Sequence, residues 1–352
     1  MSLVSLSARF FTRVSPALVI GALLASCGGA TRVSTFAPTS LVVFGDENSV
    51  ITDTATGATA GNGLKYTVNY WDATNSRQDC RLNPVWPQYV ANSFGLIFAQ
   101  CTLANPAATP TAFVQAAAGD RVASVVTKMN AYAASPGFTT KTLVTVMAGQ
   151  WDILDAYNAV VAGADRATTV ARMGPLAGNL ATAISNVTNN GNGGRVLVAT
   201  VPDVGLTPCD PASLGGVITT CLLRQQLLSD LTTEFNKQLD LQLSNNGYYV
   251  GLVRAAVIAN AVANLRVIPN GYGIINNSVA ACVAALPNCT SRVNTAVSPV
   301  VPFDLVADSV VINSSNVVSV YTYFWAGPTH FGPTVQAQIG AEADRIARNN
   351  PF

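Results

Sequence analysis

Short runs of consecutive apolar residues recur along the chain and predict buried β-strands at Ser40–Gly45, Leu143–Ala148, Arg195–Val201 and Tyr248–Val253. Continuous apolar runs, as opposed to alternating ones, are typical of strands that are covered on both faces. Between the runs, helical periodicity predicts helices over Arg121–Ala134, Ile153–Ala162, Ala167–Val187, Leu222–Leu243 and Thr334–Arg348. This alternation favours an α/β fold with a parallel sheet covered by helices on both faces.

Three segments interrupt this pattern and are rich in Gly, Asn, Thr and Pro. Residues 55–80, 208–221 and 265–300 are therefore predicted to be long surface loops. No shift in composition marks a second domain, so we expect one domain over residues 40–350.

The first residues have the features of an export signal. Arg9 and Arg13 precede the apolar stretch 14–24, which is too short to span a bilayer as a mature helix. Leu24-Ala25-Ser26-Cys27 follows and resembles a bacterial lipobox, in which the cysteine is lipidated and becomes the mature N-terminus. An ordinary signal peptide with a chance cysteine is the alternative.

The lipobox reading implies removal of residues 1–26 and a tether over residues 27–39. Cys27 would carry the acyl chains that anchor the protein in a membrane. In such lipoproteins an Asp directly after the cysteine signals retention in the inner membrane. Residue 28 is Gly, which favours the outer membrane. We therefore expect an outer-membrane lipoprotein of the bacterial cell envelope.

Composition narrows the classes of function. The net charge is +1 and charged residues make up 11% of the chain, so no basic field exists to attract nucleic acid. His330 is the single histidine, which argues against a multi-histidine metal site, and no CxxC motif is present. We expect neither metal nor cofactor.

Six of the seven cysteines follow Cys27, an even number that favours disulfides in an oxidising compartment. We expect sequential pairs because each couple falls in one candidate loop region. The predicted pairs are Cys80 with Cys101, Cys209 with Cys221, and Cys282 with Cys289.

Four sequence blocks occur in an order that resembles the GDSL, or SGNH, family of ester hydrolases. They are VFGD at 43–46, QAAAGDRV at 115–122, VMAGQWD at 146–152 and FWAGPTHFGPT at 324–334. The resemblance covers nearly all of the mature chain. It implies a flavodoxin-like, three-layer α/β/α sandwich with the site at the carboxyl ends of the strands.

Hydrolases of this family use a Ser nucleophile, a His base oriented by an Asp, and a Gly N–H with an Asn side chain that stabilise the oxyanion. By resemblance, His330 matches the base and Gly119 the oxyanion glycine. Asp46 matches the structural aspartate that braces the first turn.

Three other positions depart from the family pattern. Glu47 stands in place of the nucleophilic Ser, Trp151 in place of the oxyanion Asn, and Gly327 in place of the Asp that orients the histidine. A carboxylate at position 47 would repel an oxyanion. It could also form an ion pair with His330, which would raise the pKa of the imidazole and spoil it as a base.

Two function hypotheses follow. The first is a lipid-anchored envelope protein with an impaired site, which binds an acyl, glycan or protein partner without hydrolysis. The alternative is an active carboxylester hydrolase or lipase with His330 as base and a rearranged nucleophile. In that case either Ser49, two residues further on, or Glu47 itself would attack the ester.

Overall fold

The structure is a computed structural model of the 352-residue chain. It describes residues 36–53, 61–189, 193–209, 218–244, 250–253, 273–274, 276–294, 301–306 and 319–349. All of them belong to a unit that begins at Phe36. The predicted signal peptide and Cys27 lie outside the described residues.

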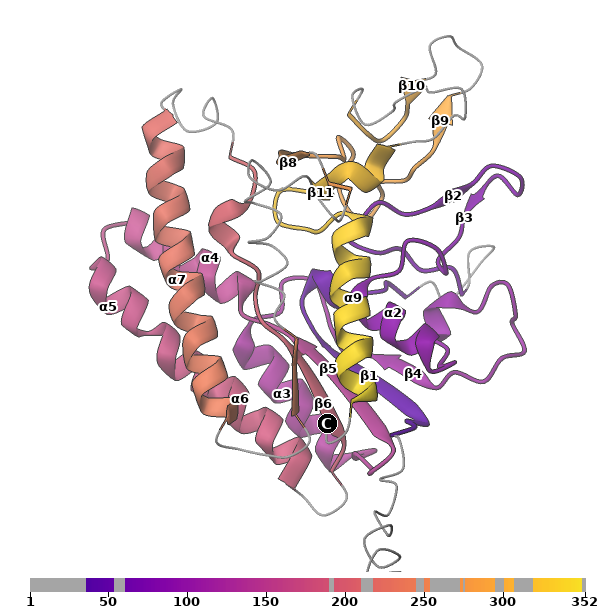
Figure 1. Cartoon of the computed structure of the whole chain (residues 1–352), viewed down its shortest axis with the longest axis horizontal. Helices are drawn as coiled ribbons and strands as arrows, with labels where there is room; N and C mark the ends of the chain where they lie inside the picture. The colour runs from indigo at the N-terminus through magenta and orange to yellow at the C-terminus, as the bar shows by residue number, and fades with distance from the viewer. Residues whose placement is uncertain are drawn as a thin grey trace, which may run out of the picture. The chain divides into compact units, whose positions relative to one another are not determined.

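A five-stranded parallel sheet forms the centre of the fold (Figure 1). Its strands are β1 (Ser40–Gly45), β4 (Ala112–Val114), β5 (Thr142–Met147), β6 (Arg195–Ala199) and β7 (Val250–Val253), in the order β4-β1-β5-β6-β7. Numbered along the chain, this is the order 2-1-3-4-5 of flavodoxin-like folds. Such a sheet has its switch point beside its first strand, so the ends of β1 and β5 are where a site is expected.

Helices cover both faces of the sheet because successive strand residues point to opposite sides. Leu41 and Val43 share a core with α2 (Trp86–Ser93) and α9 (Pro333–Arg348). Val42 and Phe44 face the second layer, formed by α3 (Val122–Ala134), α4 (Gln150–Val161), α6 (Met173–Asn189) and α7 (Ile218–Ser244). The predicted three-layer α/β/α sandwich is confirmed.

Two details differ from the sequence prediction. The helix expected over 167–187 is broken into α5 (Arg166–Ala171) and α6, because Pro175 lacks an N–H and its ring would clash with the carbonyl of residue 171. Strand β4 was not predicted, since a three-residue edge strand leaves too short an apolar run to recognise.

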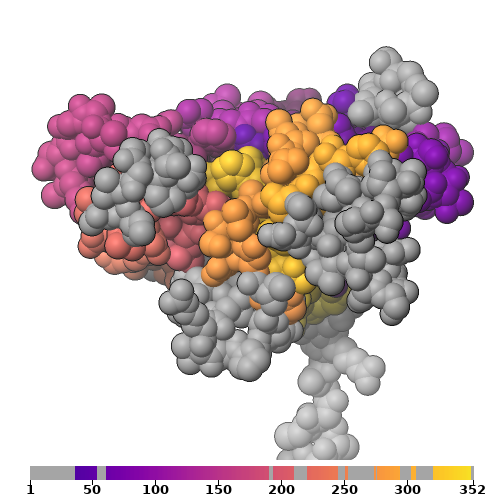
Figure 2. All heavy atoms as spheres, turned by 90° about the horizontal axis from the view of Figure 1, so that it is seen from above, coloured from indigo at the N-terminus to yellow at the C-terminus, as the bar shows by residue number. Residues whose placement is uncertain are grey.

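The segments predicted to be surface loops carry structure and burial of their own. They contain the pairs β2 (Trp71–Asp72) with β3 (Arg77–Gln78) and β9 (Val293–Asn294) with β10 (Val301–Pro302). They also contain β8 (Asn276–Ala280), which pairs with β11 (Tyr323–Trp325). These pairs lie at the end of the sheet where α9 begins (Figure 1). Viewed toward that end, the 276–306 segments in orange adjoin the C-terminal segment in yellow (Figure 2).

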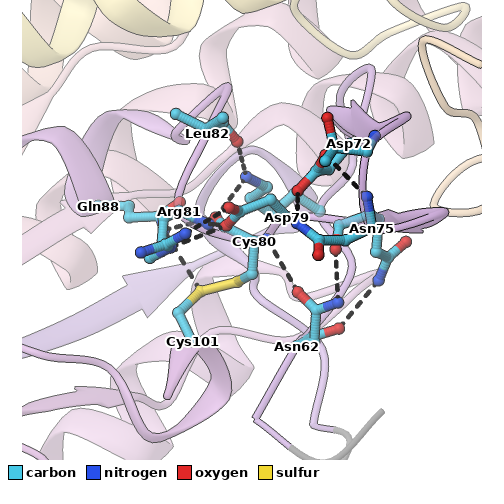
Figure 3. Close-up of polar contacts among 12 residues, drawn as sticks. Asn62, Asp72, Asn75, Asp79, Cys80, Arg81, Leu82, Gln88 and Cys101 are labelled. Atoms are coloured by element: carbon cyan, nitrogen blue, oxygen red, sulfur yellow. Dashed lines mark hydrogen bonds and ion pairs between the residues drawn. A yellow bond between two sulfur atoms is a disulfide. The ribbon is translucent and has the colours of Figure 1, made fainter. Parts of the chain in front are cut away.

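The first of these loops is anchored at a disulfide. Cys80 pairs with Cys101, and the Asn62 side chain joins the Cys80 N–H to the carbonyl of Gln78 (Figure 3). Lys65 is buried beside them, and its Nζ donates to the carbonyls of Cys80 and Leu82 at 2.8 and 2.5 Å. Polar side chains can be buried here because they form hydrogen bonds with backbone groups. The amino-acid composition of the loop does not reveal these bonds.

The other two predicted disulfides also form, Cys209 with Cys221 and Cys282 with Cys289. All three sequential pairs are thus confirmed. Short 3-10 helices complete the described elements: η1 (Glu47–Ser49), η2 (Ala99–Cys101), η3 (Val204–Leu206) and η6 (Ser319–Thr322). Among the described helices, none combines the length and the apolar character needed to cross a bilayer.

Candidate functional site

The chain turns sharply where β1 ends, and this turn begins the site. Gly45 has a φ of +140°, and a Cβ there would lie 2.2 Å from the carbonyl oxygen of Met147 on the neighbouring strand. Only glycine fits so close to β5 in this conformation. Asp46 then caps η1, accepting a hydrogen bond from the Asn48 N–H at 3.1 Å. The turn therefore presents Glu47 at the carboxyl end of the strand.

Glu47 is 4% exposed, and each of its carboxylate oxygens accepts a short hydrogen bond. Oε1 lies 2.8 Å from the backbone nitrogen of Gly119, and Oε2 lies 2.7 Å from Nε1 of Trp151. Charge-assisted bonds of this length are among the strong ones in proteins. The two donors that match the family's oxyanion positions thus hold a carboxylate of the protein itself.

The two donors are themselves held in place by neighbouring residues. The Gly119 carbonyl accepts from the Arg121 guanidinium at 3.0 Å, and that guanidinium also pairs with Asp155. Trp151 lies in the first turn of α4, after Gly149, whose φ is +122° and whose missing Cβ leaves room for Phe235. Both N–H groups are therefore preorganised toward one point.

His330 precedes α9 and lies against Tyr66, with the two ring centroids 5.6 Å apart and nearly parallel. Nδ1 and Nε2 are both buried, and neither has a hydrogen-bond partner in the described part of the chain. Gly327, three residues earlier, explains the free Nδ1: a Cβ at that position would lie 3.2 Å from it. The resemblance implied an orienting Asp at position 327, and no described side chain forms a hydrogen bond with the His330 ring in its place.

The ion pair that Glu47 could form with His330 is absent from the structure. No hydrogen bond or ion pair joins them, because Glu47 is turned toward Gly119 and Trp151. Burial lowers the pKa of His330, and the charge of Glu47 opposes that shift without reversing it. The imidazole is therefore a weaker proton acceptor than a free histidine, not a stronger one.

Ser49 lies in the same turn, but its hydroxyl is directed elsewhere. It is 1% exposed, and its Oγ accepts a hydrogen bond from Nε1 of Trp86 at 3.1 Å. Trp86 belongs to α2, within the core on that side of the sheet. The structure therefore does not bring Ser49 and the His330 ring nitrogens into hydrogen-bond contact.

A buried polar network behind the turn was not predicted from the sequence. The Asn48 Nδ2 donates to Gln150 at 3.2 Å, and the Asn48 carbonyl accepts from Gln336 at 3.3 Å. Oδ2 of Asp46 and Nε2 of Gln150 have no partner in the described region. Burial, reinforced by the charge of Glu47, raises the pKa of Asp46 to about 7. The signal available in the sequence was the presence of polar residues at the ends of two apolar strands, Asn48 after the first block and Gln150 within the third.

The second and third blocks are joined by their aspartates. Asp152 accepts from the Val122 N–H at 2.9 Å and so caps α3 from outside. Asp120 accepts from the Ala117 N–H and from Lys128. These contacts position the Gly119 turn against α4, and neither aspartate contacts His330. Tyr66, which does, comes from a loop whose role the sequence did not reveal.

The residues present suit few kinds of chemistry. No group of three or more His, Cys, Asp or Glu side chains in the described ranges could hold a metal ion. A cavity of about 380 Å³ lies between α3 and α6, but none of the site residues lines it. The site itself is a closed, hydrogen-bonded carboxylate beside a buried neutral imidazole.

The strand order and the turn after β1 give the three-layer α/β/α fold that the resemblance to the GDSL/SGNH hydrolases implied. No family model and no curated protein matches the chain in sequence.

Three solved structures are similar to it. The first is a member of the lipolytic G-D-S-L family from Veillonella parvula, at 12% identity and a TM-score of 0.39, covering 87% of this chain and 97% of the other. The second is an extracellular lipase from Streptomyces rimosus, at 14% identity and a TM-score of 0.33, covering 61% of this chain and 80% of the other. The third is a carbohydrate acetylesterase from Sinorhizobium meliloti, at 13% identity, a TM-score of 0.34 and coverages of 88% and 98%.

Proposed function

We propose that this protein is a lipid-anchored component of the bacterial cell envelope that uses a GDSL-type fold to bind a ligand or partner without hydrolysing it. The observation that carries the proposal is the pair of hydrogen bonds from Gly119 and Trp151 to the Glu47 carboxylate. An acyl, glycan or protein partner is the class of ligand we expect.

The physical argument concerns charge. In an ester hydrolase, preorganised N–H donors stabilise the negative charge that develops on the substrate oxygen. Here those donors already bind a negative charge, and a second one would be repelled at close range. Loss of a nucleophile in a comparable catalytic set costs roughly a million-fold in rate, so the remaining His330 is not sufficient.

The alternative is an active carboxylester hydrolase in which Ser49 or Glu47 attacks. The Ser49 version requires a hydroxyl poised against the imidazole, whereas Ser49 is buried and bonded to Trp86. The Glu47 version requires a free carboxylate oxygen, whereas both oxygens are held by donors. Both contacts therefore favour the binding function.

Ester hydrolysis by the full chain tests the proposal. We expect p-nitrophenyl acetate and butyrate to be released no faster by the parent protein than by a His330→Ala variant. Turnover that disappears in His330→Ala would establish the hydrolase instead. Fluorophosphonate labelling, mapped to a peptide, would then separate a serine nucleophile from Glu47.

The lipid anchor remains a proposal that rests on the lipobox-like Leu24–Cys27. An anchored protein acts at one membrane surface, where a binding function gains from a high local concentration of partners. Membrane attachment and hydrolysis are independent properties, so the failure of one proposal leaves the other standing.

A further inference from the structure

The guanidinium of Arg292, in the segment just before β9, lies over two aromatic rings. The guanidinium carbon of Arg292 is 4.8 Å from the ring centroid of Trp71 and 4.6 Å from that of Phe303. Arg292 is exposed, Trp71 is half-buried, and Phe303 is 50% exposed. We call these three residues the Arg292 clamp.

Backbone contacts between separate segments fix the clamp. The Trp71 N–H donates to the Ser291 hydroxyl at 2.9 Å, and the Phe303 N–H donates to the Arg292 carbonyl at 3.1 Å. Asp304 braces the same segment by accepting from the backbone and hydroxyl of Thr290. The backbone of the three residues is thus held in place, and the two rings lie against the Arg292 guanidinium, which lowers the entropy lost on binding.

The charge of Arg292 is not neutralised within the described part of the chain. Five other described arginines have a carboxylate partner, namely Arg81, Arg121, Arg166, Arg345 and Arg348, whereas Arg77, Arg172 and Arg224 share the lack of an ion pair with Arg292. The Arg292 guanidinium carbon lies over both rings, and its N–H donors meet no acceptor among the described residues.

The nearby carboxylates do not compete for these donors. Asp72 accepts from the backbone of Thr74 and from the side chain of Asn75, at 3.0 and 2.6 Å. Asp304 is occupied by Thr290. An external anion is therefore the missing partner that the arrangement can accept.

We propose that the Arg292 clamp binds a carboxylate-bearing saccharide such as a uronic acid residue. A planar guanidinium matches a carboxylate in two parallel hydrogen bonds. The exposed aromatic surface of Phe303 can cover the apolar C–H face of a sugar ring. One arginine without a surrounding basic field suits a singly charged group better than a polyanion. This inference rests on the proposed binding function and names the ligand class.

The test is binding of galacturonic acid, which carries a single carboxylate, to the full chain, measured by titration calorimetry and by saturation-transfer NMR. Its methyl ester is the matched probe, because it keeps the sugar ring and removes the charge. We expect the acid to bind at least tenfold more tightly than the ester, with affinity falling as salt rises. Equal affinity for the two probes, or no binding of either, would overturn the inference.

Variants locate the contact. Arg292→Gln should weaken binding of the acid roughly tenfold. Arg292→Lys should keep only part of the parent affinity, because an ammonium group lacks the paired N–H donors that bind both carboxylate oxygens. Phe303→Leu should weaken both probes. Arg172→Gln, at an exposed arginine on α5's C-terminal end, is the control and should leave binding unchanged. Thermal melting confirms that each variant is folded; unaltered binding in a folded Arg292→Gln would contradict the clamp.

The same probes separate this inference from the proposed function. Methanol released from the methyl ester, and lost in His330→Ala, would overturn the binding-only function while leaving the clamp in place. Absence of a charge preference would overturn the clamp while leaving the function proposal intact.

Discussion

Oε2 of Glu47 lies 2.7 Å from the indole nitrogen of Trp151, so two of the residues that depart from the hydrolase pattern are hydrogen-bonded to each other. Together they form a stable contact, because the large indole reaches the acid and supplies the donor that its second oxygen needs. The site is better described as rebuilt around a carboxylate than as decayed.

A Glu47→Gln variant should lose stability. The glutamine side chain has one oxygen and one NH₂ group where Glu47 has two oxygens. Its NH₂ group would face the N–H of Gly119 or of Trp151, and that buried N–H would then have no acceptor. We expect the free energy of unfolding to fall by about 1–3 kcal/mol, measured by urea denaturation. Glu342→Gln, in a surface pair with Arg345, is the control and should change it by less than about 0.5 kcal/mol. Equal stability of Glu47→Gln and the parent would contradict the contact.

Asp46 should make the parent protein less stable as the pH rises toward neutrality. Its pKa is raised to about 7, so the folded state retains a proton that the unfolded state has released above its usual pKa. The stability from that proton is present in acid and is lost as pH rises through 7. Asp46→Asn, which cannot ionise, should gain on the order of 4 kcal/mol relative to the parent between pH 4 and pH 8.

The quantity to compare is the difference in free energy of unfolding between Asp46→Asn and the parent at each pH. Other buried groups that titrate in this range contribute equally to both proteins and cancel in that difference. Burial lowers the pKa of Lys65 to about 7, which makes stability rise with pH above neutrality in both proteins. Asp155→Asn, at a surface carboxylate, serves as control. A difference between Asp46→Asn and the parent that does not vary with pH would refute this account of Asp46.

A Gly327→Asp variant should restore an orienting partner to His330. A Cβ at this position lies 3.2 Å from Nδ1, and the tip of Leu286, 2.8 Å away, must shift to admit it. We expect the pKa of the imidazole to rise by about one unit or more. His330 is the single histidine, so one set of NMR resonances reports the titration. Gly327→Asn is the uncharged control, and an identical titration in the two variants would exclude the effect.

Lipidation is tested in cells. Labelled palmitate should be incorporated into the parent protein, and Cys27→Ser should abolish incorporation and release the protein from the membrane fraction. Cys80→Ser controls for acylation at another cysteine. An unlabelled parent protein would make the N-terminal segment an ordinary export signal.

The layers of the fold could be predicted because apolar runs such as Leu143–Ala148 are buried on both faces and leave a strong signal. The loop containing Lys65 and Tyr66 could not, since its burial depends on backbone acceptors and on a ring contact with His330, which is distant in sequence. In the site, the unusual residues 47 and 151 were recognised, but not their contact. The ion pair that Glu47 could form with His330 is absent because two N–H donors hold the carboxylate more effectively than one buried imidazole.

Occupation of the donor pair by Glu47 is most directly tested with the indole N–H resonance of Trp151. The four tryptophans give four such resonances, and Trp151→Phe assigns the one of interest. Adding acetate should leave it unmoved in the parent protein and should shift it saturably in Glu47→Ala, where an external carboxylate can enter the vacated position. A saturable shift in the parent, or none in a folded Glu47→Ala, would contradict the account.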